Sequence, residues 1–453
     1  MAFDRDVVIV GAGISGLHAA LTLEAKGASV VVIEAQQRVG GRIHSMRQLG
    51  NTAEAGGTYI GAGYTRTIGA AQRHGVELMD VTSVLEFFRE QDLVYRGEII
   101  RQKDWPAHPV NDFPAGDKEH LPWNYHRVLT MRANPLEDPS AWLDPRHARL
   151  DVPACDWFRS QGLSDKAIEL AYGLNVSFGR DARDVSALLL LFRGAFSKSQ
   201  RAAAPQGSLG YTARHGVQRI CEAMAGAIQG GVELGHVVTG ISQNADGATV
   251  HCANGRRFTA QHVIAALPVG VLNRVALDPA LPKAQAEAIA HLPSQPLTQV
   301  YLAPKSKFWE SDGYAASLFT DTQAGMLAAA RNRERPSEVT SLTAWITAAH
   351  AAALDRLSPA DAGRAVIAAI EKIRPAARGQ LEVLGMHSWG GDPYAGGAWA
   401  YFRPGDVTRY AAVLGNAHGR LHFCGEHLAL KSRGMEGAME SAEEAVAEIL
   451  ANA

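Results

Sequence analysis

Glycines near the start of the chain form a pattern typical of a phosphate-binding turn. The run GAGISG (11–16) follows the apolar segment 7–10 and leads into a segment that is predicted to be a helix ending near Gly27. In this pattern the first glycine allows a tight turn, the second lets backbone N–H groups approach a pyrophosphate, and the third lets helix and strand pack closely. The spacing predicts that a helix N-terminus binds the two phosphates of a dinucleotide.

A carboxylate follows at the place where such a nucleotide site needs one. The second apolar segment, 29–33, ends on Glu34. At the end of the second strand, a carboxylate accepts hydrogen bonds from ribose hydroxyls and repels a 2′-phosphate. A glycine turn without a ligand is the alternative, but strand, glycines, helix, strand and acid in this order are more specific than the glycines alone. We therefore predict a dinucleotide site.

Two further glycine-rich segments favour a flavin dinucleotide over a nicotinamide one. The segment AQQRVGGR (35–42) places a glycine pair between two arginines, close enough to the first turn to add donors to the same ligand. The segment EAGGTYIG (54–61) supplies another dense turn, as expected where backbone lies flat beside a ring. A simple NAD domain needs neither segment. Two ordinary tight turns are the alternative interpretation.

Composition and charge exclude several classes of function. Lys and Arg total 44 against 46 Asp and Glu, so the net charge of −2 produces no field that would attract nucleic acid or anionic lipid. The four cysteines show no C-x-x-C spacing, which excludes a zinc knuckle or a dense disulfide framework and favours a reducing, cytoplasmic location. Residues 1–6 lack the basic and apolar regions of a signal peptide, so export by that route is not expected. Arg193 interrupts the longest apolar run, 185–196, which is shorter than a bilayer span requires. No metal site is predicted.

The elements that must position these residues alternate between strand and helix near the start, which predicts an α/β unit with parallel strands. Further strands are expected at 232–241, 248–252, 263–267 and 297–302, and helices at 358–373 and 441–450. Prolines gather between Pro106 and Pro153, which predicts irregular segments rather than a long helix or a central strand. Such loops either shape a pocket or cover the surface without a further role.

Four separated blocks resemble the flavin-containing amine oxidase family, which includes monoamine, polyamine, nicotine and L-amino acid oxidases. They are GAGISGL with EAQQRVGGR (11–42), EAGGTYIGAGYTR (54–66), three runs within 211–272, and SWGGDPYAGGAWAYFRPGD with HFCGEHLALKSRGMEGAMESAEEAV (388–446). The blocks keep the family's order and span nearly the whole chain. The resemblance implies an α/β fold class: a doubly wound, Rossmann-like FAD domain of the GR2 type with an inserted α+β substrate domain. The implied boundaries are 1–70, 210–275 and 386–453 for the FAD domain, and 71–209 and 276–385 for the substrate domain.

The matching motifs imply a set of cofactor-binding residues. The first turn would hold the pyrophosphate, Glu34 the adenosine ribose, Arg42 the phosphate side, the backbone of Val238 the adenine, and Glu426 the ribityl chain. The complete implied set is Gly11, Gly13, Ile14, Ser15, Gly16, Glu34, Ala35, Gly41, Arg42, Gly57, Thr58, Val238, Gly425, Glu426 and Met435. Independently of the family, the run GMEG (434–437) is predicted to begin the last helix, whose N-terminus would stabilise a reduced, anionic flavin. The implied cofactor is FAD, bound non-covalently because Ala398 stands where covalent members have a cysteine.

The resemblance also implies residues beside the reacting atoms. They are Trp399, Gln299, Tyr59, Trp389 and Gly434. Trp399 takes the first position of the family's aromatic cage, and Gly434 takes the second, so half of the cage is missing and a bulkier substrate is expected to fit. For Trp399, Trp389 and Tyr59, core packing stays open as the alternative. Gln299 stands where the family usually has a lysine that is linked to rapid reaction with oxygen.

The activity implied is oxidation of a hydrophobic amine to an imine, by hydride transfer to flavin N5 and then hydrolysis. Aromatic and alkaloid-like amines are candidate substrates, and the electron acceptor is O2, which gives H2O2, or another carrier. An L-amino acid oxidase, with Arg66 or Arg403 on the carboxylate, is one alternative, and a desaturase or porphyrinogen oxidase is another. A non-catalytic escort-type binding protein is the alternative from a different class. Some family members form homodimers, which is an analogy only.

Overall fold

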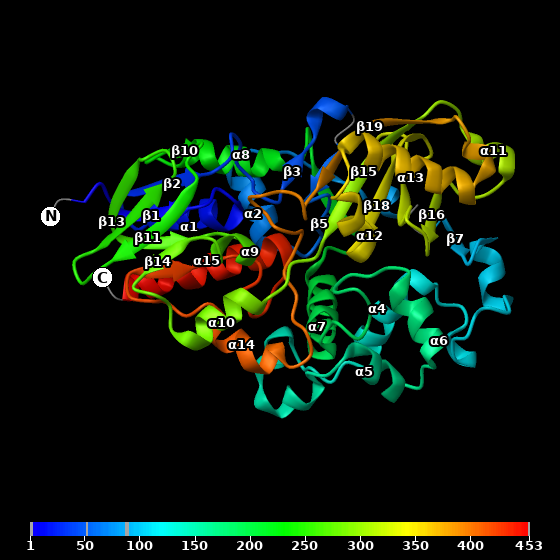
Figure 1. Cartoon of the computed structure of the whole chain (residues 1–453), viewed down its shortest axis with the longest axis horizontal. Helices are drawn as coiled ribbons and strands as arrows, with labels where there is room; N and C mark the ends of the chain where they lie inside the picture. The colour runs from blue at the N-terminus through cyan, green and yellow to red at the C-terminus, as the bar shows by residue number, and fades with distance from the viewer. Residues whose placement is uncertain (1–2, 51–52, 87–89, 452–453) are drawn as a thin grey trace.

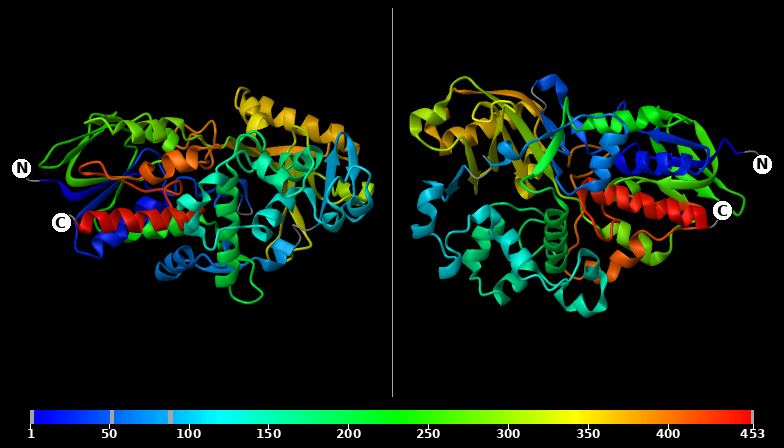
Figure 2. Two further views of the ribbon diagram at one scale, coloured as in Figure 1. Left: turned by 90° about the horizontal axis from the view of Figure 1, so that it is seen from below. Right: turned by 180° about the vertical axis from the view of Figure 1, so that it is seen from behind.

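Two large β-sheets lie toward opposite ends of the molecule (Figure 1). The structure is a computed structural model and describes residues 3–50, 53–86 and 90–451. The first strand, β1 (Arg5–Val10), begins and the last helix, α15 (Gly434–Ala451), ends at the outer end of the first sheet (Figures 1 and 2). A group of helices lies beneath the second sheet in the view of Figure 1. The predicted α/β class is confirmed.

The first sheet contains the predicted nucleotide-binding strands. Its strand order is β10-β2-β1-β13-β12-β11-β14, and β20 also pairs with β13. The bounds are β10 (Val232–Leu234), β2 (Val30–Glu34), β13 (Arg257–Ala265), β12 (Ala248–Cys252), β11 (Val238–Gln243), β14 (Ala276–Asp278) and β20 (Leu421–Phe423). β1 is parallel to β2 and β13, and α1 (Ile14–Glu24) connects β1 to β2, as predicted for a parallel unit.

The central strand β1 is buried on both faces because its alternate residues pack into different hydrophobic clusters. Val7 and Ile9 pack with α1, α15 and α8 (Gln218–Ala227), whereas Val8 and Val10 pack with residues of β12 and β13. Helices α1 and α15 lie side by side against this sheet (Figure 2). This packing fixes the carboxyl end of β1, where the glycine turn 11–16 begins.

The second sheet lies toward the other end of the molecule from the first (Figure 1). Its order is β19-β15-β18-β17-β16-β7-β8. The bounds are β19 (Leu381–Ser388), β15 (Leu297–Pro304), β18 (Val339–Thr347), β17 (Met326–Arg331), β16 (Ser317–Thr320), β7 (Gln91–Tyr95) and β8 (Glu98–Ile100). Helix α13 (Pro359–Ile373), with α12 (Ala348–Leu354), covers it (Figure 1). Ser358 caps α13 by accepting the backbone N–H of Asp361, which confirms the helix predicted at 358–373.

The helical group beneath this sheet includes the proline-rich segment. It contains α4 (Pro122–Arg132), α5 (Ala154–Ser160), α6 (Asp165–Ile168) and α7 (Ala187–Ala203). Much of 106–153 forms short 3-10 helices and loops, as predicted, but α4 is a regular helix of 11 residues. The prediction of irregular structure is wrong for 122–132, because Pro122 stands in the first turn, where a missing N–H breaks no helical hydrogen bond.

Several predicted boundaries are corrected. The strand expected at 232–241 is divided into β10 and β11, and the one expected at 263–267 is the end of the longer β13, which stops at Ala265. The last helix begins at Gly434, which confirms the prediction from the run GMEG and extends the helical segment expected at 441–450. β14 pairs with the first sheet and β19 runs to Ser388 in the second, so each crosses an implied domain boundary by a few residues.

The smaller elements are β3 (His44–Ser45), β4 (Glu54–Gly56), β5 (Ile60–Gly61), β6 (Leu78–Asp80), β9 (Gly210–Ala213), α2 (Thr65–Arg73), α3 (Thr82–Glu86), α9 (Val269–Leu272), α10 (Lys283–His291), α11 (Phe308–Asp312) and α14 (Asp406–Leu414).

None of the helices in the described ranges has the length and apolar composition needed to span a membrane. Among the same residues, no group of three or more His, Cys, Asp or Glu side chains could hold a metal ion.

Candidate active site

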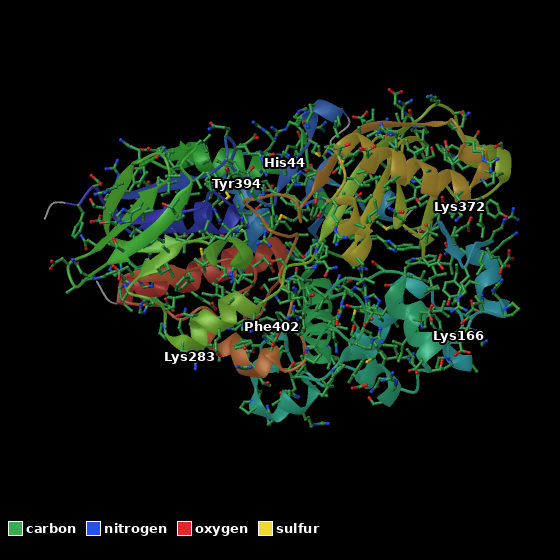
Figure 3. The ribbon with its side chains drawn as sticks, in the orientation of Figure 1. His44, Lys166, Lys283, Lys372, Tyr394 and Phe402 are labelled. Carbon is green, nitrogen blue, oxygen red and sulfur yellow. The ribbon has the colours of Figure 1, made fainter. Side chains whose placement is uncertain are left out.

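A cavity of about 460 Å³ runs from the glycine turn of the first sheet to residues of the second sheet and α7. It opens at the carboxyl ends of β1 and β2, where ligands bind in parallel α/β sheets. Every residue of the implied cofactor set lines it except Gly16. Leu297 and Trp345 contribute from the second sheet, and Tyr394 lies where the two sheets meet (Figure 3).

The three glycines of the first turn are needed for three different reasons. Gly11 has φ +109°, and a Cβ there would lie 2.7 Å from the carbonyl oxygen of Ala266. A Cβ on Gly16 would lie 2.0 Å from the carbonyl oxygen of Gly11, so Gly16 permits packing of α1 and does not reach the cavity. A Cβ on Gly13 would have nothing within 4 Å, because Gly13 faces the cavity.

The N-terminus of α1 is open to an anion. Its N-cap, Gly13, offers no side chain, and the first turn holds no acidic residue. The second glycine pair lies directly on this turn: the Gly40 N–H donates to the carbonyl oxygen of Ala12 at 2.8 Å, and a Cβ on Gly41 would lie 3.3 Å from Gly13 Cα. The two glycine segments therefore form one surface of backbone donors, which fits a pyrophosphate.

Glu34 is positioned by the same turn. Its carboxylate accepts the Ala12 N–H at 2.8 Å and the Gln36 N–H at 2.9 Å. Burial raises the pKa of Glu34 above its ordinary value, while these N–H groups act in the opposite direction. Each carboxylate oxygen keeps a further lone pair for a hydroxyl group, as the ribose role requires.

Arg42 and Glu426 connect three distant segments at the middle of the cavity. Arg42 Nη1 donates to Glu426 Oε1 and to the carbonyl oxygen of Ala398, each at 3.1 Å. Glu426 Oε1 also accepts the Ala400 N–H at 3.0 Å. Burial acts to raise the pKa of Glu426, but the charges of Arg42 and Arg433 and the hydrogen bond from the Ala400 N–H, among other contributions, together outweigh it and hold the pKa below its usual range. Glu426 is therefore a fixed anion in the cavity wall.

The remaining lining fits the flavin end of FAD. Gly57 has φ +79° and lies at the wall, and the N-terminal residues of α15, Gly434 and Met435, face the same space. The partial positive charge of a helix N-terminus is suited to a ring that becomes negative on reduction. An open helix end, a glycine-lined wall and paired side chains thus form a cradle into which FAD fits.

Three of the implied catalytic aromatics line the cavity. Trp399 donates its indole N–H to the Ser177 carbonyl oxygen at 2.9 Å, and its ring centroid lies 6.4 Å from that of Phe178. Trp389 is 2% exposed and donates its indole N–H to the Ala55 carbonyl oxygen at 2.8 Å. Its side chain therefore packs in the core and also lines the cavity. Tyr59 also lines the cavity.

Gly434 lines the cavity and leaves open space where a side chain would stand. It has φ +58°, and a Cβ there would meet only the Tyr64 hydroxyl, at 4.0 Å. Gln299 does not reach the cavity surface. Its Nε2 donates to the Ala55 carbonyl oxygen at 2.6 Å and its Oε1 accepts the Tyr301 hydroxyl at 2.8 Å, so Gln299 is buried behind the wall that Ala55 forms.

Several lining residues were missed in the sequence. Phe178, Arg193 and Arg433 also line the cavity, with both guanidinium groups over the Phe178 ring. The signal for Arg193 was visible, since it is the one charge in the apolar run 185–196. Nothing in the sequence pattern pointed to Phe178 or Arg433.

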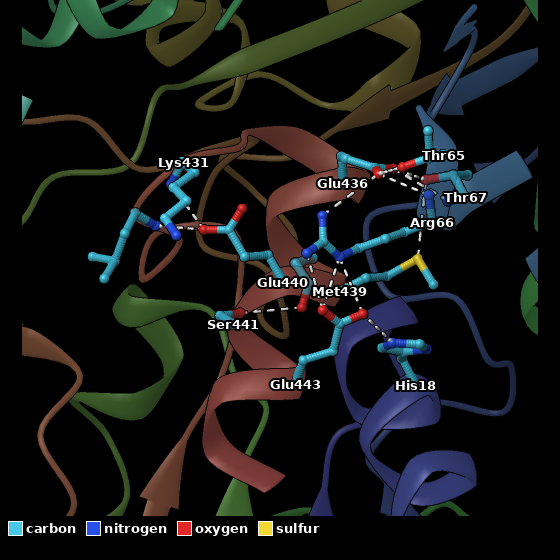
Figure 4. A network of polar contacts seen from close by, with 12 residues as sticks. His18, Thr65, Arg66, Thr67, Lys431, Glu436, Met439, Glu440, Ser441 and Glu443 are labelled. Carbon is cyan, nitrogen blue, oxygen red and sulfur yellow. Dashed lines mark hydrogen bonds and ion pairs between the residues drawn. The ribbon is translucent and has the colours of Figure 1, made fainter. Parts of the chain in front are cut away.

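Arg66 and Arg403, the two candidates for binding the carboxylate of an amino acid substrate, do not line the cavity. Arg66 donates its Nε to Glu443 at 3.0 Å and its backbone N–H to Glu436 at 2.8 Å, in a network between α2, α15 and His18 of α1 (Figure 4). Arg403 is exposed and does not line the cavity. Neither is placed to bind a ligand there.

Comparisons with known proteins agree with this arrangement. Residues 14–450 match the model of the family described as flavin containing amine oxidoreductase. The flavin-containing amine oxidase of Danio rerio is 27% identical over 98% of this chain and 85% of its own, and amine oxidase B of Homo sapiens is 26% identical over 98% and 86%. Among solved structures, a putrescine oxidase redesigned in its cofactor binding superimposes with a TM-score of 0.79 at 26% identity, and cyclohexylamine oxidase from Brevibacterium oxydans with 0.77 at 25%, each over 99% of both chains.

Proposed function

The chain belongs to the flavin-containing amine oxidoreductase family and is an FAD-dependent enzyme, and from this premise we propose that it oxidises a hydrophobic amine. The observation that carries the proposal is one continuous cavity, which joins the nucleotide-binding glycines to Trp399. A putrescine oxidase bound to putrescine and a cyclohexylamine oxidase are similar over nearly the whole chain, which supports an amine as the substrate.

The chain's residues supply orientation and exclusion of water. When bound, FAD provides the acceptor for the hydride that leaves the carbon beside the amine nitrogen. Trp399, held by Ser177, presents an aromatic face to the apolar body of the substrate, and the open position at Gly434 gives that body room. The amine loses a hydride and a proton to become an imine, which water hydrolyses to a carbonyl compound and free amine or ammonia.

Anaerobic mixing of the FAD-loaded enzyme with substrates tests this proposal. We expect hydrophobic amines to bleach the yellow flavin, and the alcohols of the same carbon skeletons, which serve as controls, to leave it unchanged. Failure of every amine to bleach loaded enzyme would overturn the proposal. A purified protein that neither contains nor takes up FAD would support the escort-type alternative instead.

We expect the flavin to be bound without a covalent bond. Ala398 lines the cavity and offers no thiol, and the nearby Cys424 is fully buried, which raises the pKa of its thiol to about 12 and keeps it unreactive. Unfolding the enzyme in acid should therefore release all of its flavin into the supernatant. A yellow protein precipitate after washing would contradict the prediction.

We infer from Gln299 that oxygen is a slow electron acceptor for this enzyme. An uncharged amide at this position offers no positive charge to stabilise the superoxide-like charge that develops on oxygen. We therefore expect slow reoxidation of the reduced enzyme by air and faster reoxidation by an artificial quinone acceptor. Gln299→Lys, whose ammonium can donate to the Ala55 carbonyl oxygen and Tyr301, should raise the rate with oxygen about tenfold or more.

Gln299→Met is the matched control for this change, because it keeps the length of the side chain without the charge. Rapid-mixing absorbance measures the return of the yellow colour in each variant. Rapid reoxidation of the unmodified enzyme by dissolved oxygen would refute the assignment of a different acceptor.

A further inference from the structure

Two arginines line the cavity without an ion-pair partner among the described residues. Arg193 belongs to α7, and Arg433 precedes the first turn of α15. Within the described part of the chain, neither guanidinium forms an ion pair or a side-chain hydrogen bond, and Arg193 Nη1 is a buried donor that lacks any partner. Both guanidinium groups instead lie over the ring of Phe178, with Cζ at 5.5 Å and 5.2 Å from its centroid.

The surroundings of these arginines are positive. Burial and the charges of Arg127 and Arg433 lower the pKa of Arg193, and only the hydroxyls of Tyr172 and Tyr64 act in the opposite direction. Glu426 is the carboxylate that acts on Arg433, but it is already bonded to Arg42 and the Ala400 N–H. An arginine side chain stays charged in proteins, and an unpaired buried charge is unfavourable, so this cluster lacks an anion.

The position of the two arginines indicates whether that anion belongs to FAD or to the substrate. The phosphates of FAD have their own donors at Gly13 and at the N-terminus of α1, among the residues of the first sheet. Phe178, by contrast, neighbours both the arginines and Trp399: its ring centroid lies 6.4 Å from that of Trp399, and all four side chains line the same cavity. A ligand that packs on Trp399 therefore shares one cavity with the guanidinium groups, and Phe178 lines it beside both.

We propose that the substrate is an amine that also carries a carboxylate, which Arg193 and Arg433 bind while its apolar body packs against Trp399. The inference rests on the proposed function and narrows its substrate class to aromatic or otherwise hydrophobic amino carboxylates. A guanidinium presents two parallel N–H donors that match the two oxygens of a carboxylate. The amine is oxidised as described above, and the carboxylate takes no part in bond changes.

Matched pairs of substrates separate this inference from the function on which it rests. Tryptophan is compared with tryptamine, phenylalanine with phenethylamine, and 4-(aminomethyl)benzoate with benzylamine, in anaerobic bleaching of the FAD-loaded enzyme. In at least one pair, we expect the compound that carries the carboxylate to bleach the flavin with a second-order rate constant about tenfold or more above that of the plain amine. Bleaching by the plain amines that is equal or faster in every pair would overturn the inference alone, whereas no bleaching by any compound would overturn the proposed function.

Binding without turnover gives a second readout. Calorimetric titration of the loaded enzyme with benzoate, which has no amine to oxidise, is compared with titration of benzyl alcohol. We expect benzoate to bind and Arg193→Met to weaken it about tenfold or more, with Arg193→Lys intermediate. Arg403→Met is the control, because Arg403 is exposed outside the cavity, and it should bind benzoate as the unmodified enzyme does.

The flavin content and thermal midpoint of each variant are measured alongside. Because Arg193 has no carboxylate partner, its replacement by Met should not lower the midpoint. Benzoate binding that matches benzyl alcohol in the unmodified enzyme, or that is unchanged in Arg193→Met, would overturn the inference. Should Arg193→Met fail to fold, the comparison of the two ligands on the unmodified enzyme still decides the question.

Discussion

Gly13→Ala is expected to fold as stably as the unmodified protein and to lose FAD, whereas Gly16→Ala is expected to lose stability before any cofactor is added. The two glycines are three residues apart in one turn, yet a methyl group meets different surroundings at each. At Gly13, with φ −69°, the methyl group would enter the cavity where the phosphates approach. We expect the dissociation constant for FAD to rise about 100-fold or more, through loss of charge-assisted hydrogen bonds to backbone N–H groups.

At Gly16 the same methyl group would lie 2.0 Å from the carbonyl oxygen of Gly11, which forces α1 away from the turn. Overpacking of this kind destabilises proteins by about 1–3 kcal/mol or more, which exceeds the gain of about 1 kcal/mol from alanine in a helix. Urea unfolding of both apoproteins and fluorescence titration with FAD distinguish the two effects. Equal losses of stability in the two variants would contradict this division of roles.

Glu426→Gln is expected to destabilise the protein and weaken FAD binding together. The substitution keeps the shape of the side chain but leaves Arg42 without a carboxylate, in a place where only 9% of the Glu426 side chain and 23% of the Arg42 side chain are exposed. Removing one partner of a buried ion pair costs about 3–5 kcal/mol, and the partial exposure of Arg42 places the expected loss of unfolding free energy at about 2–3 kcal/mol.

Glu222→Gln is the matched control, because Glu222 pairs with Arg47 through an ion pair whose side chains are 26% and 41% exposed. Pairs of that kind contribute about 0–1 kcal/mol. Urea unfolding of the two variants with and without FAD measures the difference. If Glu426→Gln were no less stable than Glu222→Gln, Glu426 would not organise the cavity as described.

The nucleotide end of the site could be predicted because its determinants are local. The strand, the turn 11–16, the helix and Glu34 occupy one short stretch, and the requirements of that turn select glycine at fixed places. The part of the cavity that contains Phe178, Arg193 and Arg433 could not be predicted, since these residues come together only when the segment before α15 lies against α7. The sequence shows Arg193 as a charged residue within an apolar run, but it does not show which groups surround the guanidinium, because these come together only in the tertiary structure.

Gln299 shows a second limit of what the sequence can predict. Its place in a strand was predicted, and β15 contains it. It lies two residues from Leu297, which lines the cavity, and so shares a face of the strand with it. Ala55, from a segment far away in the sequence, packs over Gln299 and takes its amide hydrogen bond, and spacing along the strand cannot reveal that cover.

The cavity needs α15 as much as it needs the glycine turn at the other end of the sequence. Its wall contains Gly434 and Met435, and α15 lies beside α1 against the first sheet. During synthesis the ribosome releases the turn, β1 and α1 long before this last helix emerges, so the growing chain exposes an unfinished first sheet. The wall to which α15 contributes is therefore completed only after nearly all of this chain has been synthesised, so the cavity is assembled late in folding.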